Sequence, residues 1–194
     1  IYDLGIPVNP DFHKKYSKEN TLNELNLSAS KFTILIMGGS LGMGKIKDIY
    51  EQLNEIADDI QIIIITGKNK KLYSELIKLK KDSLKATSII GFTDHVNKYM
   101  QCSDILLTKS GGLTITEALI CNLPLGIFSP IPGQEERNAE FLFKNKLAID
   151  FTDISKCGEN IERLLKYPEK LTNIAKSYTD FSKPDSGYNI VKLI

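Results

Sequence analysis

Short apolar runs rich in β-branched residues alternate with longer segments of mixed polarity along most of this chain. Six runs predict strands, at Thr33–Met37, Gln61–Thr66, Thr87–Gly91, Ile105–Thr108, Leu125–Ser129 and Leu147–Asp150. Most positions in these runs are apolar, and the second contains four consecutive isoleucines. Continuous apolar runs are typical of strands that are buried on both faces, as in a parallel sheet.

Helical periodicity fills the segments between these strands. The pattern predicts helices at Ile46–Ala57, Lys71–Lys81, Asp94–Gln101, Thr114–Cys121, Glu135–Asn145, Ile154–Leu165 and Glu169–Tyr178. Strands and helices that alternate at this spacing indicate right-handed βαβ units. We therefore expect an α/β fold with a doubly wound, Rossmann-like parallel sheet of about six strands, and we assign this domain to residues 31–183.

The two ends of the chain differ from this pattern. Residues 1–30 are polar and hold no strand, so we interpret them as a linker and a first helix. Residues 184–194 predict a tail helix, from Ser186 to Ile194. Because the first residue is Ile1 rather than a methionine, we expect the chain to be part of a longer protein.

Composition and charge narrow the classes of function. The 194 residues are 42% hydrophobic and 25% charged, which allows one large domain with a sizeable core. The formal net charge of +1 gives no strong field that would favour nucleic acid or an acidic membrane. Six lysines are either the solvated face of a helix or a basic patch: Lys68, Lys70, Lys71, Lys78, Lys80 and Lys81.

Cysteine use and motif content argue against metal sites. Cys102, Cys121 and Cys157 are far apart, and no CxxC pair is present. We therefore expect neither a zinc site nor a disulfide framework, and this usage fits a reducing, cytoplasmic compartment. No apolar run reaches the length of a transmembrane helix. The chain also lacks an Asp-x-Asp motif, which argues against a metal-bridged pyrophosphate site.

A glycine-rich loop follows the first predicted strand. Residues 38–44 hold four glycines, which let the backbone turn sharply and approach a ligand closely. A helix starts directly after this loop, and its free N–H groups and positive dipole end favour an anion such as pyrophosphate. A merely flexible loop is the alternative interpretation.

Two other phosphate-binding motifs compete for this loop. The dinucleotide pattern GxGxxG fails, since Gly42 and Gly44 are followed three residues later by Lys47. The Walker pattern GxxxxGK fits from Gly39 to Lys45, but Ile46 then stands where a magnesium-binding Ser or Thr belongs. We therefore do not expect an ATPase or a GTPase.

A second glycine-bearing loop follows the fourth predicted strand and enters a helix through Gly111 and Gly112. Thr114 can bond a phosphate oxygen there. Glu117 lies about one turn further on the same side of the helix, where its carboxylate can accept hydrogen bonds from a ribose diol. The alternative is that Glu117 only favours the helix dipole.

The loops after the third and fifth predicted strands are further candidates. Gly91–Asp94 caps the next helix through Thr93 or Asp94, and its backbone beside Phe92 can meet the edge of a base. A plain turn with a core phenylalanine is the alternative. Pro130–Asn138 is stiffened by two prolines and carries amide and carboxyl groups suited to sugar hydroxyls. Here the alternative is an ordinary polar helix start.

Together these loops resemble the C-terminal domain of GT-B glycosyltransferases. They are most similar to the group that contains monogalactosyldiacylglycerol synthase and bacterial diacylglycerol glucosyltransferases. The matching stretches run in family order along nearly the whole chain: Gly5–Val8, Met37–Gly42, Gly91–Asp94, Lys109–Ala118, and Pro132–Glu135 with Asn138–Ala139. Each stretch is weak alone, whereas five in order are specific.

The resemblance implies a donor site for a UDP-sugar. It places UDP on Gly39, Ser40, Phe92, Thr93, Ser110, Gly111, Gly112, Thr114 and Glu117, and the sugar on Gln134, Glu135 and Asn138. Glu117 would bind the ribose, and backbone near Phe92 would read the uracil. Family members transfer a hexose from UDP-glucose or UDP-galactose to diacylglycerol without a metal in the donor site. The resemblance therefore implies no cofactor, a lipid acceptor, and a peripheral location at the inner face of the membrane.

The family also has an N-terminal domain, which binds the acceptor and supplies the general base. This chain starts at the interdomain segment, so we expect it to bind the donor, to hold no catalytic residue of its own, and to transfer sugar poorly by itself. Two other hypotheses stay open. One is a nucleotide-sugar epimerase of similar architecture, and the other is a non-catalytic nucleotide-binding module.

Overall fold

A six-stranded parallel sheet forms the centre of the protein. The computed structural model describes residues 2–193. Its strands are β1 (Phe32–Met37), β2 (Ile60–Ile65), β3 (Ala86–Ile90), β4 (Ile105–Thr108), β5 (Leu125–Ile127) and β6 (Ala148–Asp150). Every neighbouring pair is parallel, in the order β3-β2-β1-β4-β5-β6. This is the strand order of a doubly wound Rossmann sheet, so the predicted fold class is confirmed.

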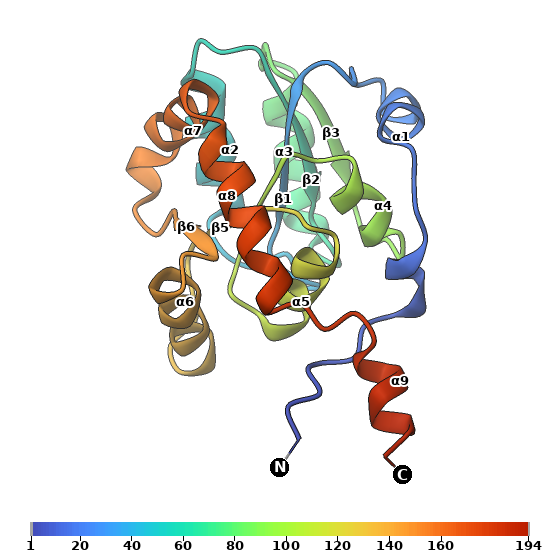
Figure 1. Ribbon diagram of the computed structural model, residues 1–194. Helices are drawn as coiled ribbons and strands as arrows, with labels where there is room; N and C mark the ends of the chain where they lie inside the picture. Colours follow the sequence, from blue (N-terminus) through green and yellow to red (C-terminus); the bar gives the residue numbers. More distant parts are fainter. Residues whose placement is uncertain (1, 194) are drawn as a thin grey trace.

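Helices cover both faces of this sheet, as Figure 1 shows. They are α1 (Lys18–Glu24), α2 (Ile46–Glu55), α3 (Lys70–Lys80), α4 (Val96–Gln101), α5 (Gly112–Ile120), α6 (Gln134–Lys144), α7 (Cys157–Lys166), α8 (Glu169–Ser177) and α9 (Ser186–Val191). α2, α3 and α7 pack against one face, and α4, α5 and α6 pack against the other. No helix between residues 2 and 193 is both long enough and apolar enough to cross a membrane.

The four central strands bury both of their faces, which explains their largely apolar sequences. In β1, Ile34 and Ile36 join the core beneath α2 and α7. Leu35 and Met37 point the other way and join the core beneath α4 and α5. Because alternate side chains enter different cores, most positions along such a strand are apolar.

Several element boundaries differ from the sequence prediction, two of them for local reasons that the structure shows. The fifth strand ends at Ile127 instead of Ser129, and Ser129 has a φ of +43°, a left-handed value that an extended strand cannot contain. The helix predicted from Asp94 starts at Val96. The Thr93 hydroxyl instead accepts a backbone hydrogen bond in a turn just before that helix.

The ends of the chain lie outside the six-stranded sheet. Between residues 2 and 30 the structure has a 3-10 turn at Pro10–His13, helix α1, and no strand. The helix predicted at Ile154–Leu165 divides into a 3-10 turn, Ile154–Lys156, and α7. The tail helix α9 ends at Val191, and Ile194 lies outside the described residues.

A buried tyrosine ties the last two strands together. The hydroxyl of Tyr178 accepts a hydrogen bond from Leu125 N at 3.0 Å and donates one to Leu147 O at 2.9 Å. The side chain is buried, and burial raises the pKa of Tyr178, so the hydroxyl stays protonated and able to donate. One phenol therefore connects the 3-10 turn after α8 to the starts of β5 and β6.

We predict that Tyr178→Phe lowers the free energy of unfolding by about 1–3 kcal/mol, because two backbone groups would remain buried without a partner. Urea unfolding followed by circular dichroism measures the change. Tyr188→Phe is the matched control, since the Tyr188 side chain is 68% exposed. Equal stability of Tyr178→Phe and the wild type would contradict this role.

Candidate functional site

The candidate loops meet where the order of the strands reverses. β1 pairs with β2 on one side and with β4 on the other, so that Met37 lies opposite both Ile65 and Thr108. The three strands therefore end side by side, and the loops that follow them leave the same edge of the sheet. Ligands of doubly wound proteins bind in the crevice at such a switch point.

The glycine-rich loop after β1 has no room for side chains at two positions. A Cβ on Gly38 would lie 1.9 Å from Met43 O. A Cβ on Gly42 would lie 2.1 Å from Thr66 O, and Gly42 also has a φ of +55°. Both positions therefore require glycine, because any larger residue would displace the backbone.

Hydrogen bonds fix the same loop against the segment between β2 and α3. The Ser40 carbonyl accepts a bond from Lys68 N at 2.8 Å. The Gly42 carbonyl accepts a bond from Asn69 Nδ2 at 3.1 Å. These contacts give the loop a defined conformation and argue against the alternative of a merely flexible loop.

A cavity of about 230 Å³ lies beside this loop, at the carboxyl ends of β1 and β2. Six of the nine residues predicted to bind UDP line it: Gly39, Ser40, Phe92, Thr93, Thr114 and Glu117. They come from two loops and from helix α5, which are far apart in the sequence. The structure thus brings together most of the predicted nucleotide site.

The other three predicted residues lie just outside this cavity. Ser110 is buried, and its hydroxyl donates to Glu135 O at 2.6 Å. Gly111 is the N-cap of α5 and Gly112 is its first residue, two positions before the predicted start at Thr114. The first N–H groups of a helix lack partners within the helix, so an anion is favoured at this end. In the part of the chain that the structure describes, no group of three or more His, Cys, Asp or Glu side chains could hold a metal ion.

Glu117 lies in helix α5 and lines the cavity of about 230 Å³. It is the sixth residue of that helix, beyond the first turn where a helix dipole acts most strongly. Burial raises the pKa of Glu117 from its ordinary value of 4.5 to about 7, because desolvation disfavours the charged carboxylate. A carboxyl in a cavity wall with a raised pKa is typical of a functional site and argues against a role limited to the helix dipole.

Phe92 is at the surface and not in the core. Its side chain is 55% exposed, and Lys68 Nζ lies 5.3 Å from the centre of its ring, within cation–π range. Phe92 and Gly67 also line a neighbouring cavity of about 730 Å³, together with Tyr73. The sequence pattern did not reveal Lys68 and Gly67, although both directly follow β2 and so lie at the same sheet edge as the other candidates.

The residues predicted to bind the sugar lie in the first turn and a half of α6. Gln134 is exposed, whereas Glu135 and Asn138 are tied to the loop between β4 and α5. Lys109 Nζ lies 3.0 Å from Glu135 Oε1. Asn138 Nδ2 donates to Ser110 O at 2.8 Å. The ion pair with Lys109 has no signal in the sequence, because the two residues are distant along the chain.

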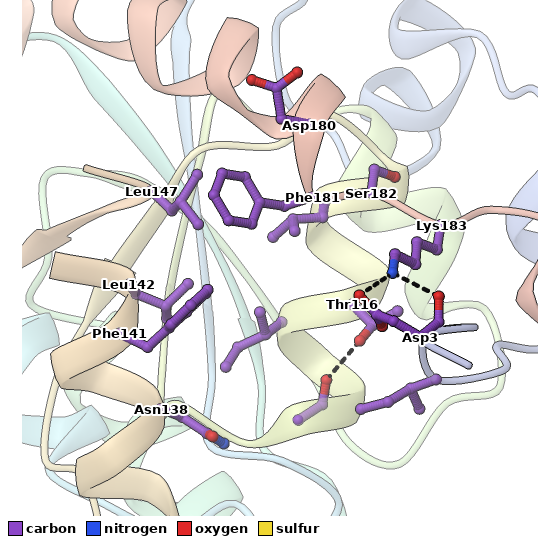
Figure 2. Close-up of a pocket in the computed structure, with 15 residues that line it drawn as sticks. Asp3, Thr116, Asn138, Phe141, Leu142, Leu147, Asp180, Phe181, Ser182 and Lys183 are labelled. Atoms are coloured by element: carbon purple, nitrogen blue, oxygen red, sulfur yellow. Dashed lines mark hydrogen bonds and ion pairs between the residues drawn. The ribbon is translucent and has the colours of Figure 1, made fainter. Parts of the chain in front are cut away.

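A separate cavity of about 460 Å³ lies on the other side of α5, where that helix faces α6 (Figure 2). Phe141 and Phe181 meet edge to face in its wall, with ring centres 5.8 Å apart. Gly112 and Asn138 line this cavity instead of the smaller one. Helix α5 therefore separates an apolar cavity from the predicted nucleotide site.

Comparison with known proteins points to one family. Residues 33–186 match the family described as Glycosyltransferase family 28 C-terminal domain. The whole chain is 27% identical to a processive diacylglycerol beta-glucosyltransferase of Bacillus cytotoxicus, and it spans 50% of that relative. The chain therefore spans about half the length of the curated relatives it matches.

Solved structures share the fold. MurG of Acinetobacter baumannii is 19% identical with a TM-score of 0.71, over 94% of this chain and 54% of MurG. Alr3699/HepE of Anabaena, solved in complex with UDP-glucose, is 13% identical with a TM-score of 0.68, over 96% of this chain and 53% of HepE. These likenesses confirm the predicted fold of a GT-B C-terminal domain.

We predict that Glu117→Gln stabilises the protein increasingly as the pH rises. The Glu117 carboxyl has a pKa of about 7 in the folded state, against an ordinary value of 4.5. Between these values the folded state binds more protons than the unfolded state, so wild-type stability falls as the pH rises through this window. Glutamine has no charge, so the variant does not lose stability in this way as the pH rises.

Urea unfolding of both proteins near pH 4 and near pH 8 measures the effect, since the titration of Glu117 lies between the two conditions. The variant should gain stability relative to the wild type only on the alkaline side. A difference of the same size at both pH values would show that the carboxyl titrates as it does in the unfolded chain.

Proposed function

This chain belongs to the family of glycosyltransferase family 28 C-terminal domains, and we propose that it is the donor-binding half of a hexosyltransferase. The donor would be UDP-glucose or UDP-galactose, and the acceptor a lipid such as diacylglycerol. The observation that carries this proposal is the cavity at the switch point, where six residues predicted to bind UDP meet. The diacylglycerol glucosyltransferase among the relatives and the UDP-glucose complex of HepE support these classes of substrate.

In this proposal UDP lies along the start of α5. The pyrophosphate sits between Ser40 and Thr114, where free N–H groups and the helix dipole favour an anion. The ribose sits beside Glu117, whose carboxylate accepts hydrogen bonds from both hydroxyls. The uracil lies at Phe92, and the hexose extends past the phosphates towards Gln134.

Transfer of the hexose leaves additional negative charge on the departing UDP. The backbone of the glycine-rich loop is held in place before a substrate arrives, and preorganised N–H dipoles of this kind stabilise developing charge. We therefore propose that the donor site works without a metal ion or another cofactor.

The acceptor site and the general base belong, in this proposal, to a second half of the protein. The length of the relatives, twice that of this chain, supports such an arrangement. The chain alone would bind the donor and transfer sugar poorly. Because the acceptor is a lipid, the full-length protein would act as a peripheral protein at a membrane surface. The free cysteines fit a reducing compartment, so we propose the cytoplasmic, inner face.

The competing functions are a UDP-sugar epimerase-like domain and a non-catalytic nucleotide-binding module, because one fold supports several functions. Full-length protein incubated with labelled UDP-glucose or UDP-galactose and diacylglycerol vesicles separates the three. Label in the lipid supports hexosyl transfer. An altered sugar without transfer supports the epimerase, and binding with neither product supports the module.

We predict that the isolated chain binds UDP equally well with magnesium and with excess EDTA, because the proposed phosphate contacts are backbone N–H groups and hydroxyls. Isothermal titration calorimetry under both conditions measures the two affinities. Loss of binding in EDTA would show that a metal ion bridges the phosphates.

We predict that Glu117→Ala weakens UDP binding about tenfold to a hundredfold, since hydrogen bonds to a charged group contribute roughly 1.5–3 kcal/mol. Alanine suits a helix interior, so the protein should remain folded. Calorimetry with UDP measures the loss. Wild-type affinity should also fall as the pH drops below about 7, because the proton on Glu117 then competes with the ribose hydroxyls.

The control ligand for this prediction is 2′,3′-dideoxy-UDP, which lacks the ribose diol. It should bind the wild type weakly and be almost indifferent to the change at Glu117. Unchanged UDP affinity in a folded Glu117→Ala protein would show that the ribose does not lie beside Glu117.

A further inference from the structure

Two loops of the proposed donor site are joined by a largely buried ion pair. Lys109 directly follows β4, and Glu135 is the second residue of α6. Lys109 Nζ lies 3.0 Å from Glu135 Oε1, and the two side chains are only 11% and 20% exposed. Removing one partner from such a pair leaves the other charge without compensation in a poorly solvated place.

Further hydrogen bonds hold the same two loops together. Glu135 Oε2 accepts a bond from Ile131 N at 3.0 Å, so both carboxylate oxygens have a partner. The Ser110 hydroxyl donates to Glu135 O, and Asn138 Nδ2 donates to Ser110 O. The start of α6 is therefore held against the residues that lead into α5.

The ion pair also lies close to the proposed phosphate position. A Cβ built on Gly111, the N-cap of α5, would lie 4.0 Å from Glu135 Oε1. A Cβ built on Gly44 would lie 3.8 Å from Lys109 Cδ. Lys109 and Glu135 thus touch the loops that follow β1, β4 and β5, which are three of the loops around the switch point.

We propose that Lys109 and Glu135 are a positioning pair that sets the spacing between the start of α5 and the start of α6. This inference rests on the proposed function, in which α5 holds the pyrophosphate and α6 reaches the hexose. In this proposal the Glu135 carboxylate, held by Lys109 and by Ile131 N, acts through the loop, and the exposed Gln134 is the group that reaches the sugar. UDP needs to contact only the start of α5, whereas UDP-glucose needs to contact the starts of α5 and α6 at the same time.

The test is a double-mutant cycle read with two ligands. UDP and UDP-glucose are titrated by calorimetry into the wild type, Lys109→Met, Glu135→Gln and the double variant. Each single change should weaken UDP-glucose binding about tenfold and leave UDP binding within about twofold. The double variant should lose no more affinity for UDP-glucose than either single variant, as expected for residues that act as a unit.

Two further variants separate positioning from a general loss of charge or fold. Lys109→Arg keeps the positive charge and should retain most of the preference for UDP-glucose over UDP. Lys144→Met makes the same charge change as Lys109→Met, but on an exposed lysine in the last turn of α6. It should leave the affinity for both ligands unchanged.

Two binding results would overturn the proposal. Equal losses for UDP and UDP-glucose in Lys109→Met, absent from Glu135→Gln, would make Lys109 a direct phosphate ligand. A loss of UDP-glucose binding in Glu135→Gln that Lys109→Met does not share would make Glu135 a direct sugar ligand.

A measurement without ligand keeps this inference separate from the proposed function. If the wild type binds neither nucleotide, the proposed function fails, and amide hydrogen exchange at Ile131 then decides the role of the pair. Lys109→Met removes no partner of the Ile131 N–H, so faster exchange there would show that Lys109 holds Glu135 in place. Unchanged exchange at Ile131 would overturn the positioning pair.

Discussion

The parallel pairing of β1 with β4 is the interaction on which the whole site depends. It sets Met37 beside Thr108, so that loops from distant parts of the chain leave the sheet as neighbours. No single loop makes the cavity. Gly39 and Ser40 come from the loop after β1, Gly67 from the loop after β2, Phe92 from the loop after β3, and Thr114 and Glu117 from α5. The sheet topology therefore assembles a site from segments that are incomplete alone.

The fold was predictable because its strands are buried on both faces. Such strands are apolar at most positions, and this produces the apolar runs that marked them in the sequence. The exact ends of the helices and strands were harder to predict from the sequence. β5 ends at Ile127 because Ser129 adopts a left-handed backbone conformation, and an apolar pattern carries no information about a single dihedral angle. The start of α5 at Gly112 was hidden for a similar reason, since glycine has a low helix propensity.

The candidate site was predictable where its residues lie in the loops after strands, as Ser40 does, or in the first turn of the next helix, as Thr114 does. What the sequence could not show were contacts between side chains that are distant along the chain. The pairing of Lys109 with Glu135 depends on tertiary distances, and so does the place of Lys68 over Phe92. The ribose role of Glu117 and the sugar roles in α6 stay predictions.

The rigidity of the glycine-rich loop has a consequence for the entropy of binding. Fixing the backbone of one residue costs about 1–2 kcal/mol of conformational entropy at 25 °C. In this protein Gly38 and Gly42 are locked in place and the Ser40 carbonyl is already bonded, so that ordering takes place during folding. In the proposed function, a nucleotide that arrives at this loop would remove little further freedom from the chain. Its departure would restore little freedom, so release would be governed by the contacts themselves and would not require the loop to unfold.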